Sequence, residues 1–288
     1  GFLFLLKLVK ILTIVLTKGK KRDKIIYGLW LPKRRDTACY IHYLYIGACK
    51  NPISSRTFKE RRTLMDFMLT EQHKMMKKLF AEFAEKDVKP LAAEVDEDER
   101  FPRENVEKMR ECKMLGIPFP REYGGAGADY LSYILAVEEL SKKCGTTGVV
   151  LSAHTSLGTW PIFAFGTEEQ KNRYLPDLCT GKKLAAFGLT EPNAGTDAAG
   201  QQTTAVKDGD DYILNGTKIF ITNAGEADVY VIFAMTDKSK GTHGISAFIV
   251  EKGMPGFTVG QHEKKLGIRG SALSLIHISE PTRPISIS

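Results

Sequence analysis

The stretch FGLTEPNAGTDAAG, residues 187–200, contains the residue types and spacings in this chain that best suit the binding of a charged ligand. It combines a hydroxyl at Thr190, an acid at Glu191, a turn fixed by proline, and the pair Gly195-Thr196. Exposed backbone amides and a hydroxyl at this pair can cradle a phosphate in a loop of low strain. The alternative is an ordinary turn that Thr196 caps. Taken alone, the Gly-Thr-Asp step leaves both interpretations open.

A second candidate stretch, KIFIT, follows at residues 218–222. Phe220 and Ile221 are large and apolar, and Thr222 adds a hydroxyl beside them. Without other information, the apolar pair is expected to pack in the core of a β-hairpin. A ligand-facing role for these residues depends on the loop at 187–200.

Several other kinds of chemistry lack their sequence patterns. The six histidines show no HExxH or similar ligand spacing, and a lone histidine such as His154 is better explained as a packed helical residue, so no metal is predicted. No GxGxxG or P-loop pattern supports a Rossmann site or an NTPase. The odd set of five cysteines has no CxxC spacing and favours reduced thiols in an intracellular protein.

The elements before the loop are predicted to be helices. From Thr70, a candidate N-cap, apolar residues recur at spacings of three and four. Further helices are predicted over 103–114, 130–143 and 147–165, and Thr167 is placed to cap a short helix that begins at Glu168. Residues 65–182 are therefore predicted to be all-helical.

The hydrophobic period changes from about 3.6 to 2 near Gly181. Short apolar runs separated by turns follow, and Asn215-Gly216 and Asp208-Gly209 each predict a hairpin turn. We therefore predict an α+β multidomain fold. In this fold an all-α domain, residues 65–182, is followed by a small antiparallel β-barrel or sandwich, residues 183–272.

The formal net charge of +7 is unevenly distributed. Residues 1–64 contain 15 Lys or Arg and 3 Asp or Glu, so this leader carries +12 and the remainder carries −5. Its apolar start, residues 1–17, is interrupted by Lys7 and Lys10 and is too short for a membrane span. Upstream sequence foreign to the mature protein, a surface-lying amphipathic helix and a targeting peptide remain alternatives. We predict no nucleic-acid binding, because the basic runs lack a recognisable motif.

The end of the chain, SLIHISEPTRPISIS, departs from the pattern that precedes it. It resembles translated cloning or adapter sequence, so residues 273–288 are predicted to be a foreign tail. We expect both the leader, residues 1–64, and this tail to pack poorly.

The string G-L-T-E-x-x-A-G-T-D-x-x-G, residues 188–200, resembles the signature of the acyl-CoA dehydrogenase family. The resemblance covers about Met65 to Ala272 and includes the segments LSAHTSLGTWPIFAFGTEEQK, LNGTKIFITNAGEADVYVIFAMTDKSKG and KKLGIRGSA. Within the family, the chain most resembles bacterial short-chain (butyryl-CoA) dehydrogenases.

This resemblance implies an N-terminal α domain at 65–182, a middle β domain at 183–272, and FAD held between the β domain and a C-terminal four-helix domain that has no match here. It implies conversion of butyryl-CoA to crotonyl-CoA, in which a carboxylate base takes the α-proton and flavin N5 accepts the β-hydrogen as hydride. Hydrogen bonds to the thioester oxygen stabilise the developing enolate. The implied partners are acyl-CoA, electron-transferring flavoprotein and three further copies in a homotetramer, in the bacterial cytoplasm or the mitochondrial matrix.

Carried over to this sequence, the family's cofactor-binding residues are Phe187, Leu189, Thr190, Gly195, Thr196, Phe220, Ile221 and Thr222. The backbone of the first three lines the flavin ring, with the Thr190 hydroxyl near its polar edge. Gly195 and Thr196 hold the pyrophosphate, and Thr196 also touches the acyl-CoA. Ile221 and Thr222 lie on the N5 side. Phe220 stands where tryptophan is common in the family, so an aromatic face is kept but the indole donor is lost.

The glutamate base of short-chain members, found in a YEGT-type sequence, has no match in this chain. Glu191 does not replace it, because in the family this glutamate belongs to the flavin loop. No catalytic residue is assigned, and the polypeptide by itself is expected to be inactive. Two alternatives remain: an acyl-CoA oxidase that reacts with oxygen, and a non-enzymatic membrane- or nucleic-acid-binding protein that acts through its basic leader.

Overall fold

The computed structural model describes residues 68–279, 282 and 284–287. The predictions made for the leader, residues 1–64, lie outside the described residues. The described residues all belong to one compact unit.

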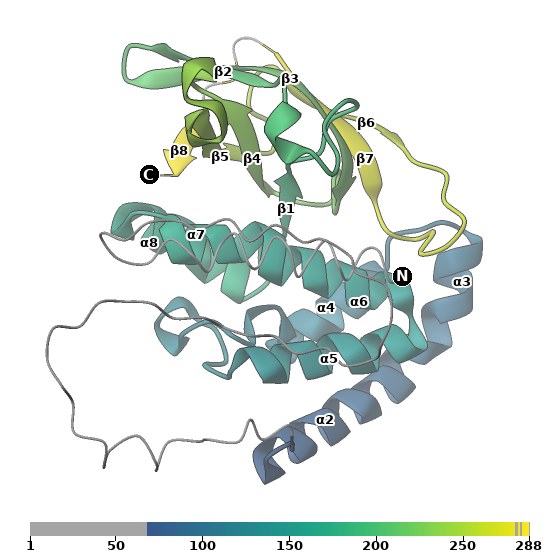
Figure 1. The fold of residues 1–288 in the computed structure, drawn as a ribbon. Helices are drawn as coiled ribbons and strands as arrows, with labels where there is room; N and C mark the ends of the chain where they lie inside the picture. Colours follow the sequence, from purple (N-terminus) through teal and green to yellow (C-terminus); the bar gives the residue numbers. More distant parts are fainter. Residues whose placement is uncertain (1–67, 280–281, 283, 288) are drawn as a thin grey trace, which may run out of the picture. The chain divides into compact units, whose positions relative to one another are not determined.

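Helices occupy the first part of the described chain (Figure 1). The α-helices are α2 Glu71–Phe83, α3 Ala92–Glu97, α4 Arg103–Glu111, α5 Tyr130–Lys143, α6 Gly145–Ser152, α7 Trp160–Phe165 and α8 Glu168–Cys179. π-Helical turns at Ala84–Val88 and Ala153–Thr159 interrupt the longer runs. The prediction of an all-helical region is confirmed for residues 68–182.

Two predicted N-caps are confirmed by their hydrogen bonds. The Thr70 side chain accepts from the amide of His73 at the start of α2. Thr167 accepts from the amide of Gln170, whose side chain accepts from the Thr167 amide in return. These contacts satisfy backbone donors that a helix leaves free in its first turn, which is why both helices begin where the sequence indicates.

Strands make up the second part of the chain. They are β1 Ala185–Gly188, β2 Thr204–Asp208, β3 Asp211–Thr222, β4 Val229–Met235, β5 Ile245–Glu251, β6 Phe257–His262, β7 Leu273–Ile278 and β8 Ile285–Ile287. They join in the order β6-β7-β3-β2-β4-β5-β8, and β1 pairs with β4. Most pairings are antiparallel, but β1 and β2 each run parallel to β4. Helices followed by this sheet confirm the predicted α+β class.

The hairpin turn predicted at Asn215-Gly216 is wrong, because β3 continues through both residues. The turn from β2 to β3 lies at Gly209, where φ is +61°, as the Asp208-Gly209 signal predicted. A Cβ atom at Gly216 would lie 2.3 Å from Oγ1 of Thr203. Glycine is therefore needed at this position for close packing within a strand rather than for a turn.

The tail was expected to pack poorly, and this expectation is wrong for its described residues. β7 lies between β3 and β6, and Ser274, Ile276 and Ile278 are buried on one face. β8 pairs with β5. The alternation in LSLIHI has the period of a half-buried strand, so these residues fit the sheet whatever their origin.

The helices and strands share their hydrophobic core. One buried cluster contains Leu151 of α6 together with Ile232 of β4. A second contains Leu178 of α8 together with Val231 of β4. Because alternate residues of β4 enter the two clusters, both sides of this strand are covered.

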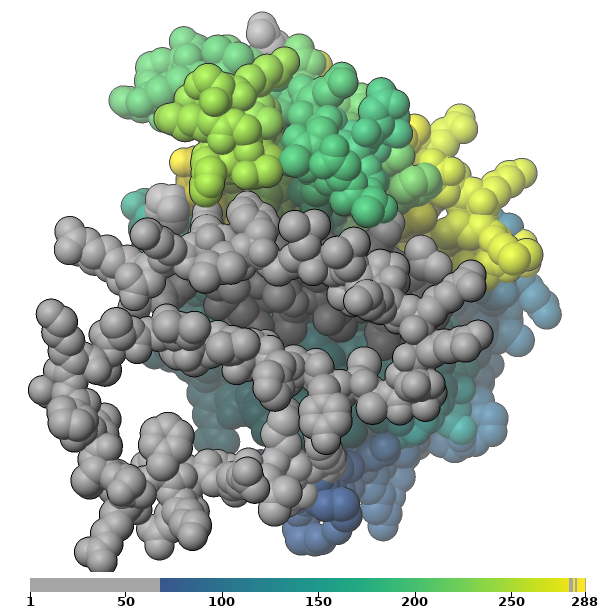
Figure 2. All heavy atoms as spheres, in the orientation of Figure 1, coloured from purple at the N-terminus to yellow at the C-terminus, as the bar shows by residue number. Residues whose placement is uncertain are grey.

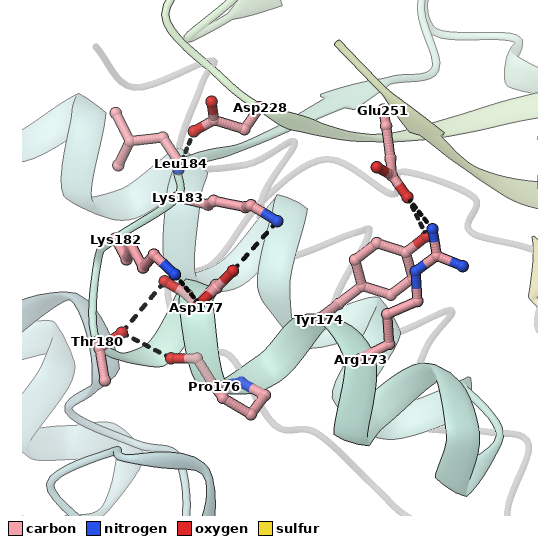
Figure 3. A network of polar contacts seen from close by, with 10 residues as sticks. All are labelled: Arg173, Tyr174, Pro176, Asp177, Thr180, Lys182, Lys183, Leu184, Asp228 and Glu251. Carbon is pink, nitrogen blue, oxygen red and sulfur yellow. Dashed lines mark hydrogen bonds and ion pairs between the residues drawn. The ribbon is translucent and has the colours of Figure 1, made fainter. Parts of the chain in front are cut away.

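Polar contacts join α8 to the sheet (Figure 3). Oε1 of Glu251 on β5 accepts a hydrogen bond from the Tyr174 hydroxyl at 2.7 Å and pairs with Nη2 of Arg173 at 2.7 Å. The Leu184 amide, just before β1, donates to Oδ2 of Asp228 at 2.9 Å. The start of β1, and with it the loop that follows, is therefore fixed to both layers. None of the helices in the described part of the chain has the length and apolar character needed to cross a bilayer.

Candidate functional site

The candidate loop, residues 189–203, begins where β1 ends, and close packing explains the glycine at that point. A Cβ at Gly188 would lie 2.5 Å from Cδ1 of Ile232 on β4, so a larger residue would require the Ile232 side chain to move. The chain leaves the sheet after Gly188 and returns to it at β2. β1 is thus held close to β4 and fixes the first end of the loop.

The tip of this loop is open. Glu191 and Ala194 exchange two backbone hydrogen bonds of 3.1 Å, which close a tight turn around Pro192 and Asn193. The next residues, 195–197, are exposed, and no atom lies within 4 Å of a Cβ placed on Gly195. Figure 2 shows the teal-green atoms of this part of the chain at the surface. The peptide groups of the tip are accessible to a ligand.

The base of the loop surrounds a buried ion pair. Nζ of Lys218 on β3 lies 2.7 Å from Oε1 of Glu191, and these two side chains are 0% and 6% exposed. The same ammonium donates to the carbonyl oxygen of Leu189 and to Oε1 of Gln201, each at 3.1 Å. An ammonium has three donors, so each of its hydrogens has an acceptor.

The carboxylate of Glu191 is similarly satisfied. Its Oε2 accepts from the Gln202 amide at 2.5 Å, and its Oε1 accepts from the Thr203 amide at 3.0 Å. Burial raises the pKa of this carboxyl, but the hydrogen bonds from Gln202, Lys218 and Thr203 outweigh burial and hold the pKa below its usual value. Burial lowers the pKa of the Lys218 ammonium, and the neighbouring Glu191 opposes this effect.

β3 has a bulge just after Lys218. Its pairing with β7 shifts register between Lys218 and Ile221, and Phe220 adopts a left-handed backbone with φ of +58°. The amide of Ile219 turns to the loop and donates to the carbonyl oxygen of Thr190 at 2.9 Å. The Phe220 side chain is 55% exposed. A bulge re-aims a side chain, and here it directs an aromatic ring out of the core.

The end of β3 is firmly anchored. Ile221 is buried, and the half-buried Thr222 pairs with Leu273. Asn223, with φ of +67°, donates through Nδ2 to the carbonyl oxygens of Val150 and Ala185, each at 3.3 Å. The bulge therefore lies between two fixed points, the ion pair and this asparagine.

The structure brings together only some of the predicted site residues. Leu189 and Thr190 are hydrogen-bonded to the segment of β3 that carries Phe220, Ile221 and Thr222. The Phe187 ring is half-buried and packs against Phe233, with ring centroids 5.1 Å apart. Within the described residues, no hydrogen bond joins Gly195 or Thr196 to β3.

An open pocket of about 410 Å³ lies beside the loop, lined by residues 191–193, 202–204 and 215–217. Most of its lining residues have polar side chains, although apolar atoms line the wall as much as polar atoms do. The described residues contain no group of three or more His, Cys, Asp or Glu side chains that could hold a metal ion.

Sequence reasoning missed Lys218. A signal was present, because Lys218 is an even number of residues from the buried Leu214 and therefore lies on the same face of β3 in the part before the bulge. A lysine on the buried face of a strand indicates a buried partner.

Comparisons with known proteins agree with the resemblance. Residues 70–182 match the family model "Acyl-CoA dehydrogenase, N-terminal domain", and residues 186–280 match "Acyl-CoA dehydrogenase, middle domain". A short-chain specific acyl-CoA dehydrogenase of Clostridium acetobutylicum is 61% identical over 221 residues, which are 77% of this chain and 58% of that protein. The chain thus spans little more than half of this relative.

Solved structures give the same result. The butyryl-CoA dehydrogenase of Megasphaera elsdenii is similar with a TM-score of 0.72 and 49% identity, over 78% of this chain and 58% of that one. A structure titled as the electron transferring flavoprotein of Acidaminococcus fermentans is similar with a TM-score of 0.74 and 57% identity, over 77% of this chain and 58% of that one. A glutaryl-CoA dehydrogenase of Mycobacterium smegmatis in complex with FADH2 is similar with a TM-score of 0.70 and 34% identity, over 76% of this chain and 55% of that one.

Proposed function

The chain belongs to the acyl-CoA dehydrogenase family, and from this premise we propose that loop 189–203 and the β3 bulge form part of an FAD site. The site serves α,β-dehydrogenation of short-chain acyl-CoA, with butyryl-CoA converted to crotonyl-CoA. The names of the Clostridium and Megasphaera relatives support this substrate class.

One observation carries the proposal: an open loop tip and an exposed aromatic ring project from the same hydrogen-bonded base. A left-handed backbone at a phenylalanine is costly, and such strain collects at ligand sites. The Phe220 ring gains nothing from the core at this position, whereas a flat aromatic ligand placed over it would bury both surfaces. The residues present therefore fit a flavin.

Each predicted residue has a role in this proposal. FAD, when bound, supplies the hydride acceptor of the reaction. The amides of Gly195 and Thr196 hold the pyrophosphate, and Thr196 also contacts the acyl-CoA. The Thr190 and Thr222 hydroxyls donate hydrogen bonds at the rim of the ring, and Phe220 covers one face. The backbone of Phe187 and Leu189, with Ile221, completes the wall.

The remaining parts of the reaction are proposed for the whole protein. A glutamate base, for which this sequence has no matching motif, takes the α-proton. Electron-transferring flavoprotein accepts the electrons, as the Acidaminococcus structure suggests by its title, and the assembly is a homotetramer in the bacterial cytoplasm or the mitochondrial matrix. An acyl-CoA oxidase would instead consume oxygen during turnover.

FAD titration of the 288-residue chain tests the cofactor site. We expect saturable quenching of flavin fluorescence, with an affinity well below that of a complete enzyme because a half-site leaves much of the cofactor in water. Fluorescence that stays unquenched over a natively folded chain would refute the site.

A further inference from the structure

We propose that Lys218 and Glu191 are positioning residues: their ion pair forms a clasp that closes the base of loop 189–203 and holds its tip in the conformation that receives the cofactor phosphates. This inference rests on the proposed FAD site. It assigns to a buried pair a role in ligand binding that is separate from chain stability.

The clasp contacts both ends of the loop. On the incoming side, Lys218 holds the Leu189 carbonyl oxygen and the Glu191 carboxylate. On the returning side, Glu191 holds the Gln202 and Thr203 amides. The segment between them, residues 192–200, crosses the opening of this ring of contacts. The separation of its two ends is therefore set by the hydrogen bonds of these two side chains.

The tip of the loop has few other stabilising contacts. Of residues 192–200, only Ala194 is buried, and Gly195 and Thr196 are exposed. A loop with few buried contacts samples many conformations unless its ends are fixed. If the ends of the loop are fixed before the ligand binds, less conformational entropy is lost on binding.

The burial of two charges in this pair costs free energy. Lys218 and Glu191 are almost completely removed from water, and desolvating two charges commonly offsets their attraction, so that well-packed neutral residues would serve stability equally well. Stability alone does not explain the pair. A charged clasp does supply directional contacts to four other groups at once, which an apolar pair cannot do.

The clasp also lies close to the aromatic side of the site. Lys218 lies two residues before Phe220, and the intervening Ile219 amide is bound to the carbonyl oxygen of Thr190. The loop and the bulge are thus both fixed to the same short segment of β3. Loss of the clasp is expected to move the phosphate-binding tip and the ring-covering residue apart.

The test replaces the pair with uncharged side chains of similar size, in the double variant Lys218→Met/Glu191→Gln of the 288-residue chain. Three quantities are measured: FAD affinity by fluorescence titration, the thermal midpoint, and hydrogen exchange of residues 189–203. The matched control is Lys240→Met, which removes a lysine from an exposed pair with Asp237 on the same domain. A pair that only supports the fold would change the midpoint and leave FAD affinity intact.

We expect the double variant to keep a midpoint near that of the wild type, to lose FAD affinity by at least about tenfold, and to exchange faster in the loop. The absorption band of any flavin that still binds is expected to resemble free flavin, and the control is expected to match the wild type. Wild-type affinity and exchange in the folded double variant would overturn the clasp and leave the FAD site standing. A wild-type chain that binds no FAD would instead overturn the proposed function, and this inference with it.

If the double variant does not fold, Gln201→Met serves as the second variant. It removes one acceptor of the Lys218 ammonium without leaving a buried charge unpaired. The expected loss of FAD affinity is about fivefold, as for one hydrogen bond. Unchanged affinity in this variant would also overturn the clasp.

Discussion

His154 and Lys218 are both fully buried and both hold backbone groups, yet one is held neutral and the other as an ammonium. Nε2 of His154 donates to the carbonyl oxygen of Leu178 on α8 at 3.1 Å, and Nδ1 accepts from the Ala185 amide on β1 at 3.1 Å. Burial lowers the pKa of this imidazole to about 4 despite the opposing contact with Leu178. The histidine thus joins two elements that already pack in the same hydrophobic core.

The Lys218–Glu191 pair holds a loop segment, residues 192–200, in which only Ala194 is buried. A neutral donor and acceptor are sufficient where packing already fixes the partners, whereas an exposed loop has to be positioned by stronger and more directional contacts. The difference indicates that His154 stabilises the fold, whereas the Lys218–Glu191 pair positions the candidate site. Substitutions at four positions test this division, from the largest expected effect to the smallest.

Lys218→Met alone is expected to have the largest effect, because it leaves the Glu191 carboxylate buried without a cation. Breaking a buried pair in this way costs about 3 to 5 kcal/mol of the free energy of unfolding. Urea denaturation measures this loss. Lys240→Met, which breaks an exposed pair, is expected to cost less than about 1 kcal/mol. If both variants lost the same free energy of unfolding, the buried pair would contribute no more to stability than the exposed one.

Acid is expected to weaken the fold through His154. Its pKa is about 4 in the folded chain and 6.5 in the unfolded chain, so the unfolded chain binds more protons between these values. The contribution of the neutral His154 to the free energy of unfolding is complete above pH 6.5. It is lost as the pH falls toward 4, by up to about 3 kcal/mol. His154→Gln, which keeps a donor and an acceptor, is expected to flatten the decline in unfolding free energy over this range. The exposed His243→Gln should keep the wild-type slope, and a wild-type slope in both variants would contradict the assignment.

Phe220→Gly and Phe220→Ala separate backbone strain from the aromatic ring. Glycine accepts a φ of +58° without strain, so the glycine variant is expected to be more stable than the alanine variant by about 1 kcal/mol. Both lack the ring and should bind FAD more weakly than the wild type to a similar degree. If both variants bound FAD like the wild type, the exposed ring would have no part in the site.

Thr196→Val is expected to have the smallest effect on the fold, because Thr196 is exposed and makes no hydrogen bond within the described chain. The thermal midpoint should be unchanged, whereas FAD affinity should fall about fivefold through the loss of one hydroxyl contact. Thr196→Ser keeps the hydroxyl and is expected to bind FAD normally. A loss of the same size in the serine variant would point to the methyl group instead.

Local chemistry made much of the fold predictable. Thr70 and Thr167 mark helix starts by side-chain hydrogen bonds to nearby amides, which requires no knowledge of tertiary structure. The error at Asn215-Gly216 arose because Gly216 is required by Thr203, a contact between neighbouring strands that the sequence does not display. β7 was misjudged for a related reason: its unusual composition hid a regular alternation that suits the gap between β3 and β6.

The candidate site was predictable where one segment carries the chemistry, as in residues 187–200. It was not predictable where segments meet. Lys218 and Glu191 are separated by 27 positions along the chain, and neither residue alone indicates the other. The outward direction of Phe220 depends on the bulge and was likewise visible only in three dimensions.

The most direct measurement joins residues 68–272 to the C-terminal part of the Clostridium acetobutylicum relative and follows dye reduction with butyryl-CoA. The account predicts a yellow protein that forms crotonyl-CoA and bleaches the dye, and that loses flavin more readily when Thr196→Val is introduced. A colourless protein that bleaches no dye, with the circular dichroism of a native fold, would contradict it.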